Sequence, residues 1–129
     1  MAGFLRLLVV INAFIIKTHF QMAVSFMKVY IAGPMSGLPA FNRPAFFQAA
    51  KEIIAAGDIA INPAVLPDGL SEADYMSISL SMLQCADAIY LLSEWRTSAG
   101  ARAEYALAEK LGIEVLFQEL SPEQCLKCK

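Results

Sequence analysis

The sequence predicts an α/β fold in which one parallel β-sheet is flanked by helices. Short apolar, β-branched segments recur along the chain, segments with helical spacing separate them, and glycine or proline stands at several junctions. Strands that alternate with helices in this way form βαβ units with right-handed crossovers. A chain of 129 residues is expected to form a single domain of this kind.

The first half of the chain contains two predicted strands with a helix between them. Lys28–Ala32 is apolar and β-branched, as expected for the opening strand of a domain. Pro44–Ala56 has a helical pattern and ends at Gly57, because glycine readily adopts the left-handed conformation that closes a helix. Asp58–Ile61 is the second strand, and the turn residues Asn62-Pro63 end it.

The second half of the chain repeats the alternation. Glu72–Gln84 carries an apolar helical pattern, and Ala88–Leu92 is an apolar strand. Ala99–Leu111 is the third helix, which Gly112 closes, and Glu114–Phe117 is the last strand.

The expected sheet order is 2-1-3-4, with room for one more strand, as in flavodoxin- and Rossmann-like folds. Ligands of such sheets bind beyond the carboxyl ends of the strands, where the winding direction reverses. This order brings together the loop Gly33–Gly37 after the first strand and the loop Ser93–Gly100 after the third. Glu104 is then expected near the mouth of the same crevice.

Three regions are expected: an apolar leader (1–26) outside the fold, the domain itself (27–120), and a short terminal helix or tail (121–129) that Ser121 caps. Residues 3–16 are apolar, but as a helix they would span only about 21 Å of a bilayer core of about 30 Å. An upstream extension, with translation starting at Met27 or Met22, is favoured over a membrane or interface anchor.

The charge and cysteine content exclude several classes of function. A net charge of −2 without a basic stripe argues against a nucleic-acid partner. The odd number of cysteines forms no disulfide framework, and Cys85 is expected to be a packed, reduced thiol in a cytoplasmic protein. Cys125 and Cys128 form a lone C-x-x-C, and His19 is the only histidine, so neither a metal nor a redox cofactor is expected.

The loop after the first strand is a candidate substrate-binding segment. Gly33, Pro34, Met35, Ser36 and Gly37 combine two glycines that permit close backbone approach with a serine that hydrogen-bonds phosphate or sugar. The loop lacks the G-x-G-x-x-G spacing and the lysine of a P-loop, so nicotinamide and ATP sites are not indicated. The alternative is an ordinary tight turn.

Ser98–Glu104 is the second candidate substrate-binding segment, because it places one carboxylate at the start of a helix whose other side chains are mostly small and apolar. Helix N-termini attract anions through their unpaired N–H groups and their dipole. Ser98 and Gly100 are therefore candidates for binding a phosphate or carboxylate, while Glu104 faces the substrate. The alternative for Glu104 is a solvated helix carboxylate.

Four segments carry a pattern that is fairly specific as a combination: Tyr30–Gly37, Asn62-Pro63, Ala86–Ile89 and Ser98–Glu104. Together they resemble the nucleoside 2-deoxyribosyltransferase-like superfamily, in particular its small phage and bacterial members of unknown function. The resemblance extends from about Met27 to Phe117.

The resemblance implies N-glycosidic chemistry, in which a helix glutamate attacks the anomeric carbon of a 2-deoxyribonucleoside or nucleotide and forms a glycosyl-enzyme. Glu104 stands at that position; water would give hydrolysis and a second base would give transfer. Ser98 matches a serine that contacts the 5′-phosphate in related monophosphate N-glycosidases, so a deoxynucleoside 5′-monophosphate is preferred. Tyr30 matches a tyrosine close to the nucleophile, although it also suits an ordinary strand position.

Ser79 departs from the family's pattern. Relatives usually carry an aspartate there, eight residues before Asp87, which helps to protonate the leaving base. Serine is a poor general acid, and loss of such a group costs about 10²–10⁴-fold in rate. Asp74 is a substitute only if the helix is shifted, and Asp87 suits a structural cap. The alternative function is a nucleotide-binding module with impaired catalysis.

The loop after the third strand also carries Trp95, which suits stacking on a base, and Arg96, which suits a phosphate. The alternatives are a hydrophobic lid or dimer contact for Trp95 and a solvated surface for Arg96. The preferred interpretation of Phe41, Asn42 and Arg43 is a loop that leads into a helix, and the second is a segment that contacts the base or the sugar. We expect a small nucleoside or nucleotide as substrate and a homo-oligomer, because relatives form dimers or larger assemblies.

Overall fold

The computed structural model describes residues 26–119, in which four parallel strands form one sheet. In chain order the elements are β1 (Lys28–Ala32), η1 (Pro39–Asn42), α2 (Arg43–Ala55), β2 (Ile59–Ile61), η2 (Pro63–Val65), α3 (Glu72–Gln84), β3 (Ala88–Leu91), η3 (Trp95–Thr97), α4 (Ala99–Leu111) and β4 (Glu114–Phe117), where η marks a short 3₁₀-helix. The sheet order is β2-β1-β3-β4, so the predicted α/β class and the predicted order are both confirmed.

Within residues 26–119 the predicted strands and helices all form, and their bounds differ from the predicted ones by at most one residue. Asp58 stays outside β2, and its carboxylate instead accepts a hydrogen bond of 3.1 Å from the backbone N–H of Met27 at the start of β1. Gly112 closes α4 with a φ of 69°, as expected of a left-handed helix cap. The three 3₁₀-helices were not predicted, because such short turns show no periodicity in sequence.

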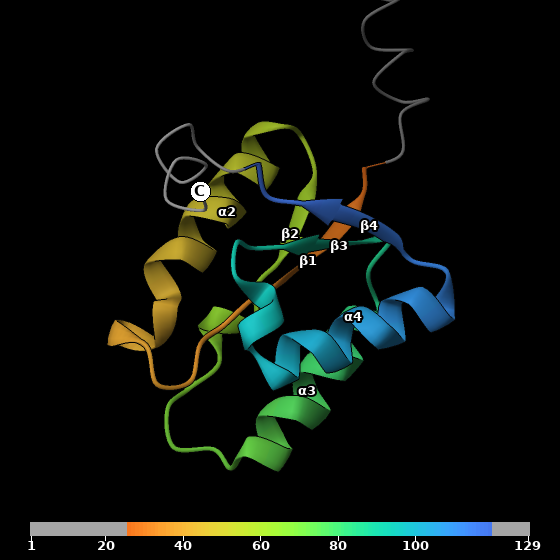
Figure 1. Ribbon diagram of the computed structural model, residues 1–129. Coiled ribbons are helices and arrows are strands. Elements are labelled where there is room, and N and C mark those ends of the chain that lie inside the picture. The colour runs from red at the N-terminus through yellow and green to blue at the C-terminus, as the bar shows by residue number, and fades with distance from the viewer. Residues whose placement is uncertain (1–25, 120–129) are drawn as a thin grey trace, which may run out of the picture.

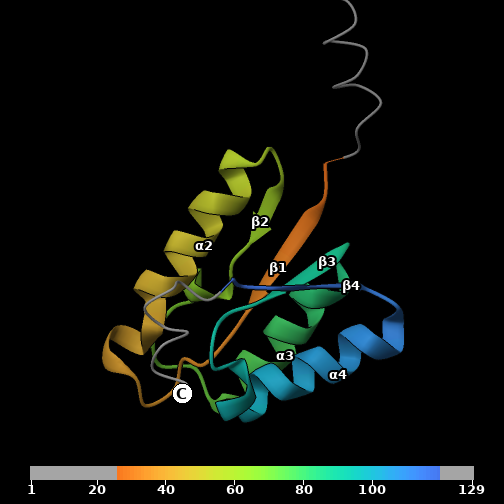
Figure 2. The same ribbon diagram turned by 45° about the horizontal axis from the view of Figure 1, so that its top comes forward.

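The helices cover the two faces of the sheet unequally. Figures 1 and 2 show α2 on one face and α3 with α4 on the other. Successive side chains of β1 point to opposite faces, so Val29 and Ile31 belong to the core beneath α2. Tyr30 and Ala32 belong to the core beneath α3 and α4. Strand alternation therefore presents position 30 to those two helices.

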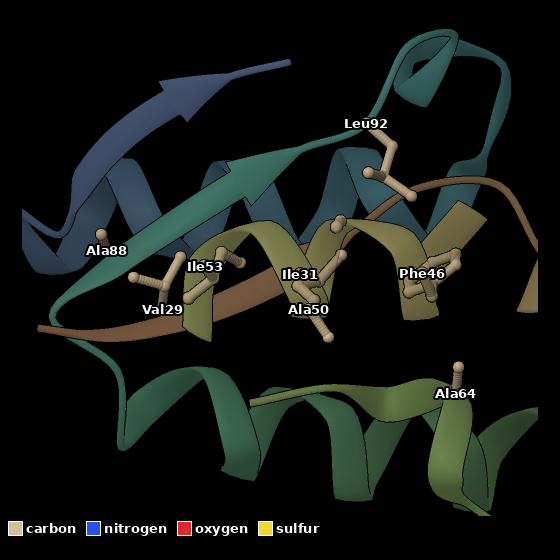
Figure 3. Close-up of a cluster of buried hydrophobic side chains, with 9 residues drawn as sticks. Val29, Ile31, Phe46, Ala50, Ile53, Ala64, Ala88 and Leu92 are labelled. Carbon is tan, nitrogen blue, oxygen red and sulfur yellow. The ribbon is translucent and has the colours of Figure 1, made fainter. Parts of the chain in front are cut away.

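The core beneath α2 fixes the position of β1. In Figure 3, Ile53 of α2 lies beside Val29 of β1. Phe46 of α2 and Ile31 of β1 belong to the same buried cluster. These four side chains are at most 8% exposed, and burying each one stabilises the fold by about 1.5–3 kcal/mol. The strand that carries Tyr30 is thus held firmly from its opposite face.

The carboxyl ends of β1 and β3 lie side by side, because these two strands are neighbours in the sheet. The N–H of Leu92 still donates to the carbonyl of Ala32 at 2.9 Å, one residue beyond β3. A Cβ on Gly33 would lie only 2.9 Å from Cβ of Leu92, so this close approach requires glycine at position 33. The loops that follow both strands therefore meet at the sheet edge where a ligand site was expected.

Several predicted features lie outside the described residues: the leader apart from Phe26, the terminal helix at 121–129, His19, Cys125 and Cys128. The expectation of a packed thiol at Cys85 is wrong, because Cys85 is the C-cap residue that follows α3 and is exposed. Asp87 has the expected structural role, since its carboxylate accepts a hydrogen bond of 2.9 Å from the N–H of Lys28. Within residues 26–119, no helix has the length and apolar character needed to cross a membrane.

Candidate active site

A buried tyrosine–glutamate pair lies between the sheet and α4. The Tyr30 hydroxyl donates a hydrogen bond of 2.8 Å to Oε1 of Glu104. Glu104 shares the buried face of α4 with Ala101 and Ala108, whose small side chains let the helix approach β1 closely. Only 7% of Glu104 is exposed, so it is not a solvated helix carboxylate.

The surroundings of this pair alter the acidity of both groups. Burial raises the pKa of Glu104 to about 7, and the hydrogen bond from Tyr30 opposes that rise. Burial and the nearby Glu104 carboxylate raise the pKa of Tyr30, while the nearby Ser79 side chain lowers it. Tyr30 therefore remains a hydrogen-bond donor near neutral pH, where Glu104 exchanges its proton.

Ser79 extends the pair to a third element, the helix α3. It is 7% exposed on the buried face of α3, and its side chain lies close enough to the Tyr30 hydroxyl to lower the pKa of that hydroxyl. The residue at the expected acid position thus lies in the site, although it carries a hydroxyl. Asp74 does not take its place, because its carboxylate accepts a hydrogen bond of 3.3 Å from the N–H of Ser71 in the capping box that starts α3.

A cavity of about 120 Å³ opens beside Ser79. Its apolar wall consists of Met35, Phe41, Pro63, Leu66 and Tyr75. Its polar wall consists of Ser36, Arg43, Asp68, Glu72 and Ser79. An apolar wall with a few polar groups is typical of sites that bind a flat heterocyclic ligand. We call this the first cavity.

A second cavity, of about 340 Å³, lies at the N-terminus of α4. Ser98, Ala99 and Gly100 line it from α4 and its cap, and Pro34, Met35, Ser36 and Leu38 line it from the loop after β1. The first N–H groups of a helix have no acceptor within the helix, so those of Ala99 and Gly100 suit an anion or an oxygen-rich ligand. Two carboxylate residues, Glu72 and Glu94, also line this cavity.

The two cavities adjoin each other, because Met35, Ser36 and Glu72 line both. The Ser36 hydroxyl donates a long hydrogen bond of 3.4 Å to Oε1 of Glu72. The two cavities together form one groove that runs from Ser79 to the start of α4. This groove lies where the sheet topology predicts a ligand site.

The structure brings most of the predicted site residues together. Tyr30, Ser79 and Glu104 form one buried chain of side chains. Pro34, Met35, Ser36, Ser98 and Gly100 line the groove. Gly33 and Gly37 line neither cavity; Gly33 is required by its contact with Leu92, and Gly37 has a φ of +78° in the turn.

Trp95 does not lie where a base-stacking role requires it. It is 8% exposed, belongs to the core beneath α4, and packs against Tyr105 with ring centroids 4.7 Å apart. The predicted stacking role is therefore replaced by a structural one. The guanidinium of Arg96 lies over the Trp95 ring, 4.7 Å from its centroid, and Arg96 lines neither cavity.

The segment that enters α2 also contributes to the first cavity. Phe41 is 48% exposed, and the guanidinium of Arg43 lies 5.3 Å from the centroid of its ring. Arg43 pairs with Asp68, and the Asn42 side chain donates to the carbonyl of Pro34 at 2.9 Å. Asp68 and Glu72 had no signal in the sequence, because only the path of the chain between η2 and α3 brings them to the groove.

A family model described as a domain of unknown function, DUF4406, matches residues 27–117 of the chain. The match includes all four strands, the three helices and every residue of the groove discussed above. No curated protein matches the chain significantly.

Proposed function

This chain belongs to the DUF4406 family, and we propose that it cleaves the N-glycosidic bond of a 2-deoxynucleoside 5′-monophosphate, or transfers its deoxyribosyl group. Glu104 is the proposed nucleophile. The proposal includes membership of the nucleoside 2-deoxyribosyltransferase-like superfamily, which the motifs Tyr30–Gly37 and Ser98–Glu104 resemble.

The observation that carries the proposal is the buried hydrogen bond between Tyr30 and Glu104. A carboxylate that is 7% exposed and has a pKa of about 7 is uncommon on a helix, and such groups concentrate at functional sites. The hydrogen bond occupies Oε1 of Glu104, so we assign the attack on the substrate to Oε2. Of Tyr30, Ser79 and Glu104, Ser79 is the one that lines the first cavity, and neither Tyr30 nor Glu104 lines either cavity. A carboxylate suits this reaction because the transition state resembles an oxocarbenium ion, which an anion stabilises and then captures.

The proposed reaction has two steps. In the first, Oε2 of ionised Glu104 bonds to C1′ of the sugar while the C1′–N bond breaks, and the departing base takes a proton from water. In the second, water attacks C1′, the ester bond to Glu104 breaks, and 2-deoxyribose 5-phosphate leaves as the water's proton passes to solvent. A second base in place of water completes a transfer.

The groove supports a particular orientation of the substrate. The first cavity has the apolar wall and the exposed Phe41 ring that suit a nucleobase, and Ser79 connects it to Tyr30 and Glu104. The second cavity has the N-terminus of α4 and the Ser98 hydroxyl, which suit the phosphate end. Ser98 already accepts a hydrogen bond of 3.1 Å from the N–H of Ala101, so its own hydroxyl proton is free to be donated.

Ser79 favours a second candidate function, a nucleotide-binding module with impaired catalysis. Its hydroxyl lies at the position from which a proton donor is expected to serve the leaving base, and serine does not supply that proton efficiently. In this alternative the groove binds the nucleotide and Glu104 contributes structure only.

Base release from the four common 2-deoxynucleosides and their 5′-monophosphates distinguishes these functions. The wild-type chain is expected to release base from at least one of them, and Glu104→Gln, which keeps the shape and the acceptor of the side chain, is expected to release none. Tight binding without base release, unchanged in Glu104→Gln, supports the binding module instead. Thermal unfolding of both proteins shows whether the substitution alters the fold.

We also propose a cytoplasmic homo-oligomer without metal or redox cofactor. Phe47, Ile54 and Ile59 expose between 46% and 61% of their surface on α2 and at β2, which suits a contact with another copy. Light scattering coupled to size-exclusion chromatography tests this assembly, and a monomer at all concentrations would contradict it.

A further inference from the structure

We infer that Ser36 and Glu72 together bind the 3′-hydroxyl of the substrate's deoxyribose, an inference that rests on the proposed function. In a deoxynucleotide the base is attached at C1′ and the 5′-phosphate is carried from C4′, the two carbons on either side of the ring oxygen, so the sugar ring separates the base from the phosphate. With the base in the first cavity and the phosphate in the second, the sugar lies across the wall that the two cavities share. The residues of that wall therefore meet the sugar.

Only two polar side chains belong to this shared wall in the described part of the chain. Met35, Ser36 and Glu72 line both cavities, and of these three Met35 is apolar. Ser36 comes from the loop after β1, and Glu72 comes from the first turn of α3. A sugar that lies across this shared wall can therefore form hydrogen bonds with one hydroxyl and one carboxylate.

The contact between these two residues suits the insertion of a hydroxyl group. At 3.4 Å the hydrogen bond from Ser36 to Glu72 is at the long end of the range, and both partners are accessible. A ligand hydroxyl placed beside them accepts a hydrogen bond from Ser36 and donates one to Glu72, so both of its hydrogen-bonding functions are used. When a ligand without this hydroxyl binds, Ser36 and Glu72 keep only the long hydrogen bond that they form with each other.

The backbone holds both residues in place before a ligand arrives. Ser71 and Asp74 form a complete capping box that fixes the first turn of α3, where Glu72 lies. Gly37, with its φ of +78°, forms the turn that follows Ser36. The site therefore requires little ordering when the sugar binds.

Calorimetric binding of matched ligands tests the inference. The ligands are the four common 2-deoxynucleoside 5′-monophosphates and their 2,3-dideoxy counterparts, which lack only the 3′-hydroxyl. A hydrogen bond to a charged group is expected to favour the deoxy ligand by about 10- to 100-fold in the wild-type chain. Glu72→Ala and Ser36→Ala are each expected to reduce this ratio to about threefold or less.

Glu94→Ala is the matched control, because Glu94 is an exposed carboxylate residue that lines the second cavity but not the first. It alters affinity for deoxy and dideoxy ligands alike, so the ratio stays at its wild-type value. Three outcomes would overturn this inference and leave the proposed function standing. They are equal wild-type affinity for the deoxy and dideoxy ligands, an unchanged affinity ratio in Glu72→Ala, and a loss of the ratio in Glu94→Ala as large as that in Glu72→Ala. Absence of binding for all eight ligands overturns the proposed function and this inference with it.

Discussion

The Tyr30 hydroxyl donates a 2.8 Å hydrogen bond to Glu104, which lies 74 residues later in the chain. The pair joins the middle of the central strand β1 to the middle of α4. Burial favours the protonated form of Glu104, while the hydrogen bond favours its ionised form. The balance of these two effects places its ionisation close to neutral pH.

Tyr30→Phe is expected to slow base release and to shift its pH dependence. The substitution removes the hydrogen bond that lowers the pKa of Glu104, so a higher pH is needed to ionise the nucleophile. At neutral pH we expect a loss of about tenfold or more in kcat/KM, with the rising limb of the profile displaced to higher pH. A profile from about pH 5 to pH 9 identical to that of the wild type would show that Tyr30 does not tune Glu104.

Ser79→Asp is expected to increase base release by about 10²-fold or more, because it supplies a proton donor for the leaving base. The new carboxyl group lies next to Tyr30 and near Glu104, so we also expect a bell-shaped pH profile in place of a single rising limb. Single-turnover base release by the variant and the wild type measures both effects. A variant that folds but releases base no faster than the wild type would show that the hydroxyl at position 79 does not limit the rate of base release.

Glu104→Gln is expected to stabilise the fold at high pH only. The native state binds the Glu104 proton more tightly than the unfolded chain does, so the wild-type stability falls as the pH rises from 4.5 to about 7. This pKa difference corresponds to a loss of about 3 kcal/mol above that range, which glutamine avoids. Urea unfolding below about pH 4.5 and above about pH 8 measures the difference; an equal effect at both pH values would contradict the raised pKa.

Glu94→Gly is expected to favour phosphate-bearing ligands. Glu94 has a φ of 63°, a conformation that costs non-glycine residues about 1–2 kcal/mol, and it lines the cavity assigned to the phosphate. Removing its charge is expected to raise affinity for a monophosphate several-fold over the corresponding nucleoside, more so at low salt. Glu94→Gln separates the causes: it should give the affinity gain without relief of backbone strain. Equal affinity changes for nucleoside and monophosphate would contradict the charge effect.

The fold was largely predictable from sequence, for identifiable reasons. Lys28–Ala32 and Ala88–Leu91 are buried apolar strands, and Gly57 and Gly112 mark helix ends by their backbone freedom. The helical spacing of α3 and α4 then restricts the sheet to few topologies. The roles predicted for Tyr30, Ser79 and Glu104 came from the resemblance of the sequence to the superfamily's motifs, and the alternation of side chains along β1 explains why Tyr30 faces α4.

The remaining features depend on tertiary packing that sequence patterns do not encode. Trp95 stands between the polar Glu94 and Arg96 and suggested an exposed loop, yet the turn η3 directs its ring into the core. Glu72 suggested only a helix start, and its contact with Ser36 depends on where α3 sits relative to the loop after β1. Such contacts between short segments far apart in sequence require the assembled fold.

Mass spectrometry of acid-quenched reactions tests the central claim most directly, because a glycosyl-enzyme is a covalent species on one side chain. The chain is mixed with each of the four common 2-deoxynucleoside 5′-monophosphates, quenched, and digested. We predict a 2-deoxyribosyl 5-phosphate adduct on the peptide that contains Glu104, absent from Glu104→Gln. Base release that continues in Glu104→Gln, with no adduct on the wild-type peptide, would contradict the role of Glu104.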